Sequence, residues 1–242
     1  MNQHVFRRLS PFALLLPFAA CAVPPIPYDR TATPEVHSIA VLSPGFRDKP
    51  TVFVAASPGR SFGLIGGIIE AGIEANRESR FAEAIGHTDI KPRQEFTDAL
   101  LAAVTAQGYS TQLVPVNHPE DGFATDYKPA ADITADAWLD CYAPNWGYLA
   151  AGTADTTPYR PMLAARCELV RPADRKVLMR DTVWYNPLSM NGGAASQSVT
   201  IAPDPRFAFV TSDDLDADPA KAVDGVRTSF THVTGAIGRL LQ

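Results

Sequence analysis

Hydrophobic and polar side chains alternate most regularly between Ala135 and Tyr185. Three segments in this stretch, residues 135–143, 162–170 and 176–185, sort their side chains with a period of two, which is typical of a strand with two unlike faces. One face carries small and aliphatic residues, and the other carries charged and aromatic ones. The pattern predicts an antiparallel three-stranded meander that packs its aliphatic face on helices and turns the other face to solvent.

The charged and aromatic face is the sharpest candidate for a partner-binding site. It would present the side chains of Asp136, Trp138, Asp140, Tyr142, Arg180 and Trp184. Acids beside aromatic rings can hold sugars or basic peptides, and the alternative is a solvated face of cross-strand charge pairs. Asp136 and Asp140 would lie about 13 Å apart, beyond the roughly 5–9.5 Å between the two acids of a glycosidase. We therefore expect binding here and no catalysis.

The aliphatic face of the same strands carries Cys141 and Cys167. These two cysteines fall on strands that should be neighbours, and an oxidising compartment would permit a disulfide between them. The alternative is a pair of buried thiols that act as small apolar side chains. The sequence leaves both possibilities open.

Other periodic segments complete the expected fold. Strands are expected over 37–42, 51–55 and 109–116, with an edge strand over 206–211, and helices over 61–86, 92–107 and 218–241. Gly108 stands where a helix would stop, and Asp218 followed by Pro219 stands where one would start. Together these segments predict an α/β (α+β) fold, an antiparallel-rich mixed sheet whose three-stranded meander packs on two or three helices.

The expected helix over 61–86 has an unusual pattern of small residues. Gly63, Gly67, Ala71 and Ala75 recur every four residues, beside several isoleucines. Small residues at this spacing let another backbone approach closely. One interpretation is close packing of this helix on the sheet or on a loop. The other is self-association or insertion into a membrane surface, since the apolar run is too short to span a bilayer.

The first residues of the chain are typical of an export signal. Arg7 and Arg8 precede a short apolar run, and the segment Phe18-Ala19-Ala20-Cys21 resembles a bacterial lipobox, which implies an acyl anchor on Cys21. The alternative is an ordinary secretory signal. We expect residues 1–20 to be a lipoprotein signal peptide, 21–35 a Pro-rich extended tether, and 36–242 a single periplasmic α/β domain. In the lipoproteins that this segment resembles, Asp after the cysteine favours the inner membrane, so the resemblance implies that Ala22 directs the protein to the outer one.

Charge and motifs narrow the function classes. Removal of residues 1–20 takes away two arginines and lowers the net charge from −5 to −7, so nucleic acid is not an expected partner. No phosphate-binding loop or serine-hydrolase elbow occurs. His118 in a polar loop is a weak metal ligand candidate, and the acids at 214, 216 and 218 lack the Gly and Glu of a calcium loop. We expect no cofactor, no metal and no enzymatic activity.

The order of elements and the pattern ADxxLDxxx…YRPxLxARCELVxPxxxKVLxxDT resemble a family of bacterial envelope lipoproteins. This pattern covers residues 37–42, 92–116 and 132–185 and is similar to the amino-terminal domain of TolB, in a group that includes the curli-secretion lipoprotein. The resemblance implies a binding or assembly protein with an envelope protein or a cell-wall component as its partner. Two alternatives are an oligomeric secretion or assembly component that uses the helix over 61–80 and, more remotely, an envelope hydrolase.

Overall fold

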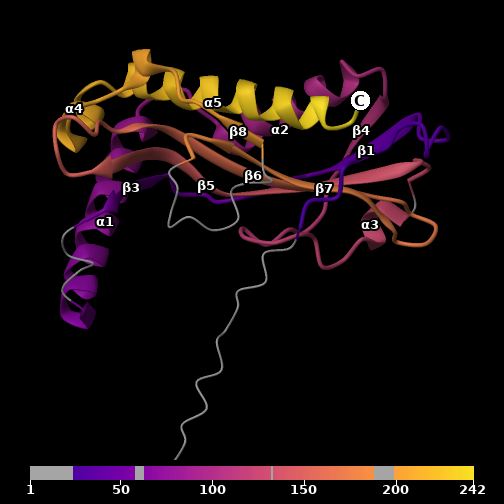
Figure 1. Ribbon diagram of the computed structural model, residues 1–242, viewed down its shortest axis with the longest axis horizontal. Coiled ribbons are helices and arrows are strands. Elements are labelled where there is room, and N and C mark those ends of the chain that lie inside the picture. Colours follow the sequence, from indigo (N-terminus) through magenta and orange to yellow (C-terminus); the bar gives the residue numbers. More distant parts are fainter. Residues whose placement is uncertain (1–23, 58–62, 132, 188–198) are drawn as a thin grey trace, which may run out of the picture.

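The computed structural model describes residues 24–57, 63–131, 133–187 and 199–242 (Figure 1). The predicted signal peptide and Cys21 lie outside these residues. The elements are β1 (Ser38–Leu42), β2 (Gly45–Phe46), β3 (Thr51–Ala56), α1 (Gly63–Gly86), α2 (Pro92–Thr105), β4 (Ser110–Val114), α3 (Lys128–Ala131), β5 (Ala137–Gly152), β6 (Arg160–Val170), β7 (Val177–Tyr185), β8 (Val199–Ile201), the 3₁₀ turn η3 (Pro205–Phe207), α4 (Ser212–Ala217) and α5 (Pro219–Arg239).

The eight strands form one mixed sheet in the order β4-β1-β5-β6-β7-β8, with β2 and β3 pairing to further parts of β5. β1 is parallel to both β4 and β5, and β8 is parallel to β7. β5, β6 and β7 form the predicted antiparallel meander. The structure therefore confirms an α+β fold with a mixed sheet packed with helices.

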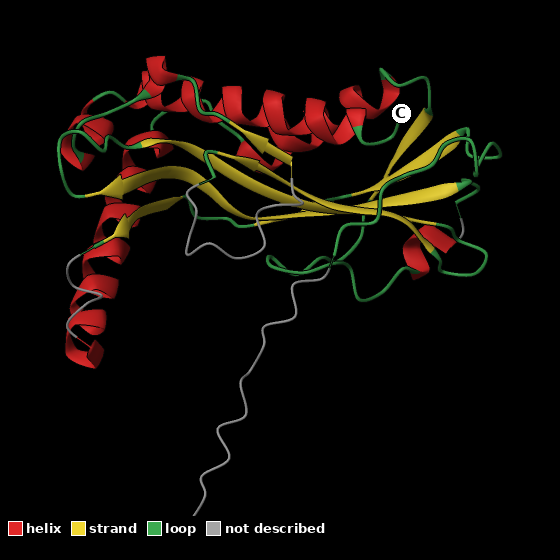
Figure 2. Ribbon diagram, in the orientation of Figure 1, coloured by secondary structure: helices red, strands yellow, loops and turns green. Residues whose placement is uncertain are grey.

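Helices α2 and α5 cover one face of the sheet (Figures 1 and 2). α5 starts as the sequence predicted, since the Asp218 side chain accepts a hydrogen bond from the Lys221 amide and Pro219 occupies the first turn. Its apolar stripe, which includes Phe230 and Ile237, is buried in the large core between helices and sheet. Gly225 permits this contact, because a Cβ there would lie 2.3 Å from the Tyr148 hydroxyl.

Strand β5 is longer than the sequence predicted. Residues after 143 were expected to form a loop, but the strand continues to Gly152 after a register shift between Tyr142 and Asn145. The shift brings Trp146 and Tyr148 into the large core. A proline and two glycines in this stretch predict a loop. Gly147 instead adopts φ +129° where the backbone of Thr51 in the neighbouring strand comes within reach of a Cβ, so the glycine serves strand pairing.

Two further expectations were wrong. Residues 21–35 were expected to form an extended tether, but from Ile26 onward the chain is attached to the domain. The Ile26 amide donates to the Arg180 carbonyl (2.8 Å), and the Arg180 amide donates back to Ile26 (2.9 Å). The expected edge strand over 206–211 is also absent among the described residues. Its place is taken by η3 and a single bridge between Phe209 and Tyr159, and the strand at the edge beside β7 is β8.

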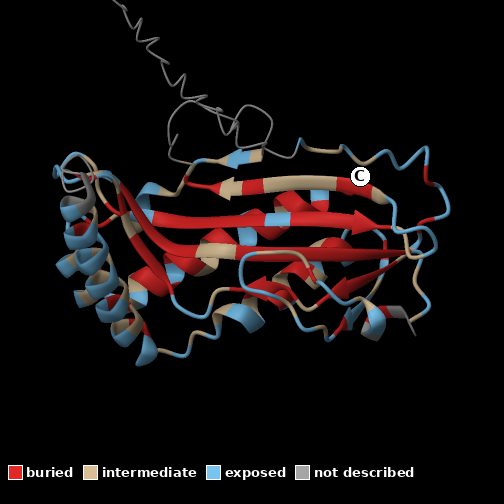
Figure 3. Cartoon of the chain, turned by 90° about the horizontal axis from the view of Figure 1, so that it is seen from below, coloured by how far each residue is buried: buried red, intermediate tan, exposed pale blue. Residues whose placement is uncertain are grey.

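The sheet face opposite α2 and α5 is covered by a loop segment, residues 117–131, which includes the single turn α3. A smaller core of six buried residues lies there: Ala40, Leu42, Val114, Ala124, Ala130 and Trp138. Figure 3, which looks toward this side, shows β5 and β6 coloured as buried along most of their length. Both faces of the central strands are therefore covered.

Candidate functional site

The face that the sequence predicted as a wet binding surface is organised around a buried carboxylate, Asp140 on β5. Asp140 is 0% exposed. It accepts hydrogen bonds from the Tyr127 hydroxyl (2.6 Å), the Ala124 amide (3.0 Å) and Nε2 of His118 (2.6 Å). All three donors come from the segment 117–131, so this one acid fastens the segment to the sheet.

His118 is a buried partner of Asp140, with a side chain that is 2% exposed. Its two ring nitrogens both face acceptors, Nε2 toward the carboxylate and Nδ1 toward the Pro119 carbonyl (3.0 Å). Burial opposes protonation, but the hydrogen bonds to Asp140 and Pro119 outweigh it, and the pKa of His118 is raised. With both ring nitrogens facing acceptors, the imidazole has no free nitrogen to accept a proton from a substrate.

Beside this network, three side chains stack over the sheet. The ring of Tyr127 lies parallel to that of Trp138, with centroids 5.5 Å apart. The guanidinium of Arg175 lies 4.4 Å from the Trp138 ring and 5.0 Å from the Tyr127 ring. Trp138 is 2% exposed, and its indole N–H has no hydrogen-bond acceptor among the described residues. Burial and the bond to Asp140 raise the pKa of Tyr127, which keeps its hydroxyl a donor.

An open hollow of about 470 Å³ remains next to this stack. It is lined by Thr125, Asp126, Tyr127, Lys128, Glu168, Val170, Arg175 and Val177. Glu168 is ion-paired with Arg180 across β6 and β7. The hollow offers one aromatic ring and charges of both signs, and no group of three or more possible metal ligands occurs among the described residues.

The segment 117–131 covers some of the predicted site residues and leaves others exposed. Trp138, Asp140 and Tyr142 are buried, which contradicts the expectation of a wet face. Tyr142 is covered by Phe123, whose ring lies edge-on at 4.9 Å. Asp136 remains exposed, but it accepts bonds from the His37 and Ser38 amides and from the Ser38 hydroxyl.

Arg180 and Trp184 on β7 are half-buried. The period-two pattern assigned the residues correctly to the two faces of the sheet, but it did not indicate that the segment 117–131 covers one of them. Sequence reasoning missed Tyr127 and Arg175 and gave His118 only as a weak metal-ligand candidate in a polar loop. The signal that the segment 117–131 offered was its two aromatic residues, Phe123 and Tyr127.

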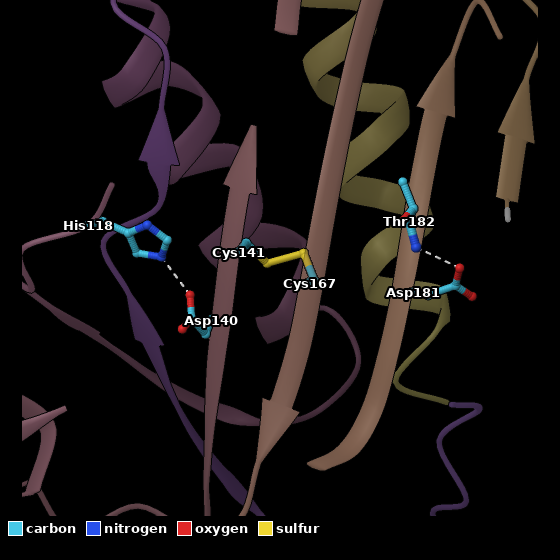
Figure 4. Close-up of a disulfide and its surroundings, with 6 residues drawn as sticks. All are labelled: His118, Asp140, Cys141, Cys167, Asp181 and Thr182. Atoms are coloured by element: carbon cyan, nitrogen blue, oxygen red, sulfur yellow. Dashed lines mark hydrogen bonds and ion pairs between the residues drawn. A yellow bond between two sulfur atoms is a disulfide. The ribbon is translucent and has the colours of Figure 1, made fainter. Parts of the chain in front are cut away.

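On the opposite face of the same strands, Cys141 and Cys167 are joined in a disulfide (Figure 4). They are direct partners in the register of β5 and β6. Asp140 and His118 lie on the other side of β5 in the same view. The disulfide therefore belongs to the large core, away from the hollow.

The second candidate surface is the N-terminal half of α1, which projects beyond the sheet on the side opposite α2 and α5 (Figures 1 and 2). Its isoleucines are exposed: Ile65 75%, Ile68 65%, Ile69 59% and Ile73 40%. Their spacing of three to four residues places them on one face of the helix. No helix among the described residues is long and apolar enough to cross a membrane.

The charged side of α1 faces the domain. Glu70 is 6% exposed and lies 3.7 Å from Arg77, and Glu78 pairs with Arg47 at 3.3 Å. The small-residue row is not packed against the sheet: Gly67 is half-exposed and Ala71 and Ala75 are exposed, while Gly63 is the first helical residue. The first interpretation was close packing on the sheet or on a loop, and its first half, packing of this row on the sheet, is wrong.

Comparison with known proteins leaves the family open. No family model and no curated protein matches the chain. Among solved structures, a PelC dodecamer from Paraburkholderia phytofirmans is 12% identical over 91% of this chain and 96% of that one, with a TM-score of 0.38. A Xanthomonas campestris protein described by the DUF330 family model is 11% identical over 85% of each chain, with a TM-score of 0.40. TM-scores this low assign neither family nor function, and the likeness to the TolB amino-terminal group stays a prediction.

Proposed function

We propose that this protein is a lipid-anchored periplasmic protein of the bacterial outer membrane that acts as a non-catalytic docking module. Cys21, at the end of the export signal, is the proposed site of acylation. The chain between that cysteine and the domain is short, because Ile26 already pairs with Arg180. The domain would thus work at the membrane surface and not at the end of a long tether.

The docking role rests on one observation: the apolar side of α1 faces outward, and its charged side faces the domain. A surface helix normally buries its apolar stripe and leaves its charges in water. α1 instead buries Glu70 and exposes Ile65, Ile68 and Ile69. A contiguous apolar patch on the surface is typical of an interaction site. The direction in which this patch faces is fixed by the ion pairs that join α1 to the domain, Glu78 with Arg47 and Arg80 with α4.

The buried Asp140–His118 pair gives no support to the hydrolase alternative. A general base needs a free nitrogen within reach of the substrate, and both nitrogens of His118 already face acceptors. The described part of the chain places no hydroxyl or thiol nucleophile against this histidine. The pair instead holds the segment 117–131 on the sheet.

The proposal can be tested in cells with a photo-crosslinking amino acid at position 69 and, as a matched control, at Leu113, which is exposed on the edge strand β4. Crosslinks between this protein and its docking partner should form from position 69 and not from position 113. Intact-mass measurement of the membrane fraction should show an acylated N-terminus at Cys21. A protein recovered without acylation, or one that crosslinks equally from both positions, contradicts the proposal.

The alternative is an oligomeric assembly component, favoured by the exposed Ala71 and Ala75 beside the isoleucines. Light scattering of the acylated protein in detergent distinguishes the two. A stable large assembly that Ala71→Leu dissolves would support the alternative, whereas a monomer would exclude it.

A further inference from the structure

We infer that the partner of the exposed α1 face is the lipid monolayer itself: Ile65, Ile68, Ile69 and Ile73 enter the same leaflet that holds the acyl chains of Cys21. This inference rests on the proposed lipid anchor. It names lipid, and not a second protein, as what covers the helix.

Only a short length of chain lies between Cys21 and the domain. Pro24 is the first described residue, and the two backbone hydrogen bonds between Ile26 and Arg180 fix the chain to β7. Pro24 is three positions after Cys21, and three residues of fully extended chain span at most about 11 Å. An acylated Cys21 would therefore hold this side of the domain against the headgroups, within reach of surface side chains.

The anchored end of the chain and α1 face in the same direction. The N-terminal end of the described chain and the projecting half of α1 lie on the same side of the sheet, opposite α2 and α5 (Figures 1 and 2). The side that the anchor draws to the bilayer is thus the side on which the isoleucines stand. Figure 3, which looks toward that side, shows α1 as a largely exposed helix at one end of the molecule.

Helix α1 is held rigidly at its C-terminal half. Its C-terminal half is fixed to the domain, because Phe81 packs edge-on against Tyr148 at 5.5 Å and Arg80 pairs with Asp213 and Asp216 of α4. The N-terminal half is the continuation of this fixed helix. An apolar helix face of this kind enters a monolayer by about 5–10 Å. This depth is enough to bury the isoleucine side chains.

The size of the patch also favours lipid over a second copy. Each partner of a stable protein complex buries about 800 Å². Four partly exposed isoleucines supply only a few hundred Å², which is in the range of an ordinary surface patch. Binding to a monolayer does not require so large a buried area, because the acyl chains provide most of the affinity for the membrane and the helix adds to it.

The test places a fluorescent reporter in the helix. Full-length acylated protein carrying Ile69→Trp is reconstituted into vesicles of phosphatidylethanolamine and phosphatidylglycerol with brominated acyl chains. The matched control is Leu113→Trp, on the edge strand beside α2. After subtraction of the parent protein, which contains Trp138, Trp146 and Trp184, the emission from position 69 should be quenched at least about twofold, and the emission from position 113 should not change.

The outcomes separate the two proposals. If the Ile69→Trp protein floats with the vesicles while its introduced indole remains unquenched, lipid insertion is overturned and the anchored docking role stands. Protein that does not float overturns the anchor and both proposals with it. An unquenched indole at position 69 together with copy-to-copy crosslinks from that position assigns the face to a second copy, which also overturns the inference.

A second measurement removes the anchor instead. Cys21→Ser keeps the export signal and abolishes acylation, so any remaining retention on vesicles comes from the protein surface. Adding Ile69→Glu should lower that retention about tenfold, whereas adding Leu113→Glu should not. Equal retention of the two double variants overturns the inference.

Discussion

The covered sheet face around Trp138 and the exposed face of α1 are opposite departures from the usual distribution of side chains. The first gathers acids and aromatic rings, yet Trp138 and Asp140 are buried. The second gathers isoleucines, yet they face outward. In both regions the periodicity predicts which residues share a face. What lies over that face depends on a segment elsewhere in the chain, or on a partner.

The physical reason differs between the two regions. The sheet face is polar enough to be stable in water, but it also supplies one acceptor, Asp140, that three donors of the segment 117–131 can share. In α1, the ion pair of Glu78 with Arg47 and those of Arg80 with α4 hold the charged side of the helix against the domain. Fixed polar contacts therefore decide the cover in one place and the exposure in the other.

The largest expected effect is that of Trp138→Ala. If the ring is part of the second core, its removal should lower the free energy of unfolding by about 3–5 kcal/mol, as for other buried aromatic residues. Trp184→Ala, on the same sheet but half-buried, is the matched control and should cost less. Denaturant unfolding measures both, and equal small losses would show that Trp138 is not core.

The next largest effect is expected for Asp140→Asn. The amide keeps the shape of the carboxylate but loses its charge and part of its acceptor capacity, so buried donors from His118, Ala124 and Tyr127 are left poorly paired. We expect a loss of about 2–3 kcal/mol. Asp121→Asn, at an exposed position in the same segment, should change stability by less than about 0.5 kcal/mol. Urea titration measures the free energy of unfolding of both variants. An equal loss in the two would contradict a stabilising role for the hydrogen bonds to Asp140.

A smaller effect should appear in the pH dependence of His118. Its pKa is raised in the folded protein, so the stabilisation that it provides is complete below the unfolded pKa of about 6.5 and is lost as the pH rises through the folded pKa. The stability difference between the parent and His118→Gln should therefore be larger at pH 6 than at pH 9. Unfolding curves of both proteins over this range test the sign, and the reverse order would contradict a raised pKa of His118.

The smallest effect is expected for Ile69→Ser on α1. Because Ile69 is 59% exposed, its replacement should change the stability of the domain by no more than about 0.5 kcal/mol. The same replacement at Ile237, which is buried on α5, should cost about 3–4 kcal/mol. Thermal unfolding in detergent-free buffer compares the two, and a large loss at position 69 would show that α1 packs against the domain.

The sequence alone determined most of the secondary structure. The period of two placed β6 and β7 within two residues of their observed bounds, and Asp218 with Pro219 marked the start of α5. These signals are local, because a strand alternates and a helix is capped through neighbours in sequence. Gly147 shows the limit: a residue that predicts a loop serves instead the approach of a strand from elsewhere in the chain.

The tertiary structure decided the burial of each face. Tyr127, His118 and Asp140 come together only because the segment 117–131 folds back over β5, and nothing in the spacing of these three residues predicts that contact. The direction of α1 was likewise open, since a helix with one apolar and one charged side can turn either way. Burial is a relation between distant segments, and so it is fixed only when all of them are in place.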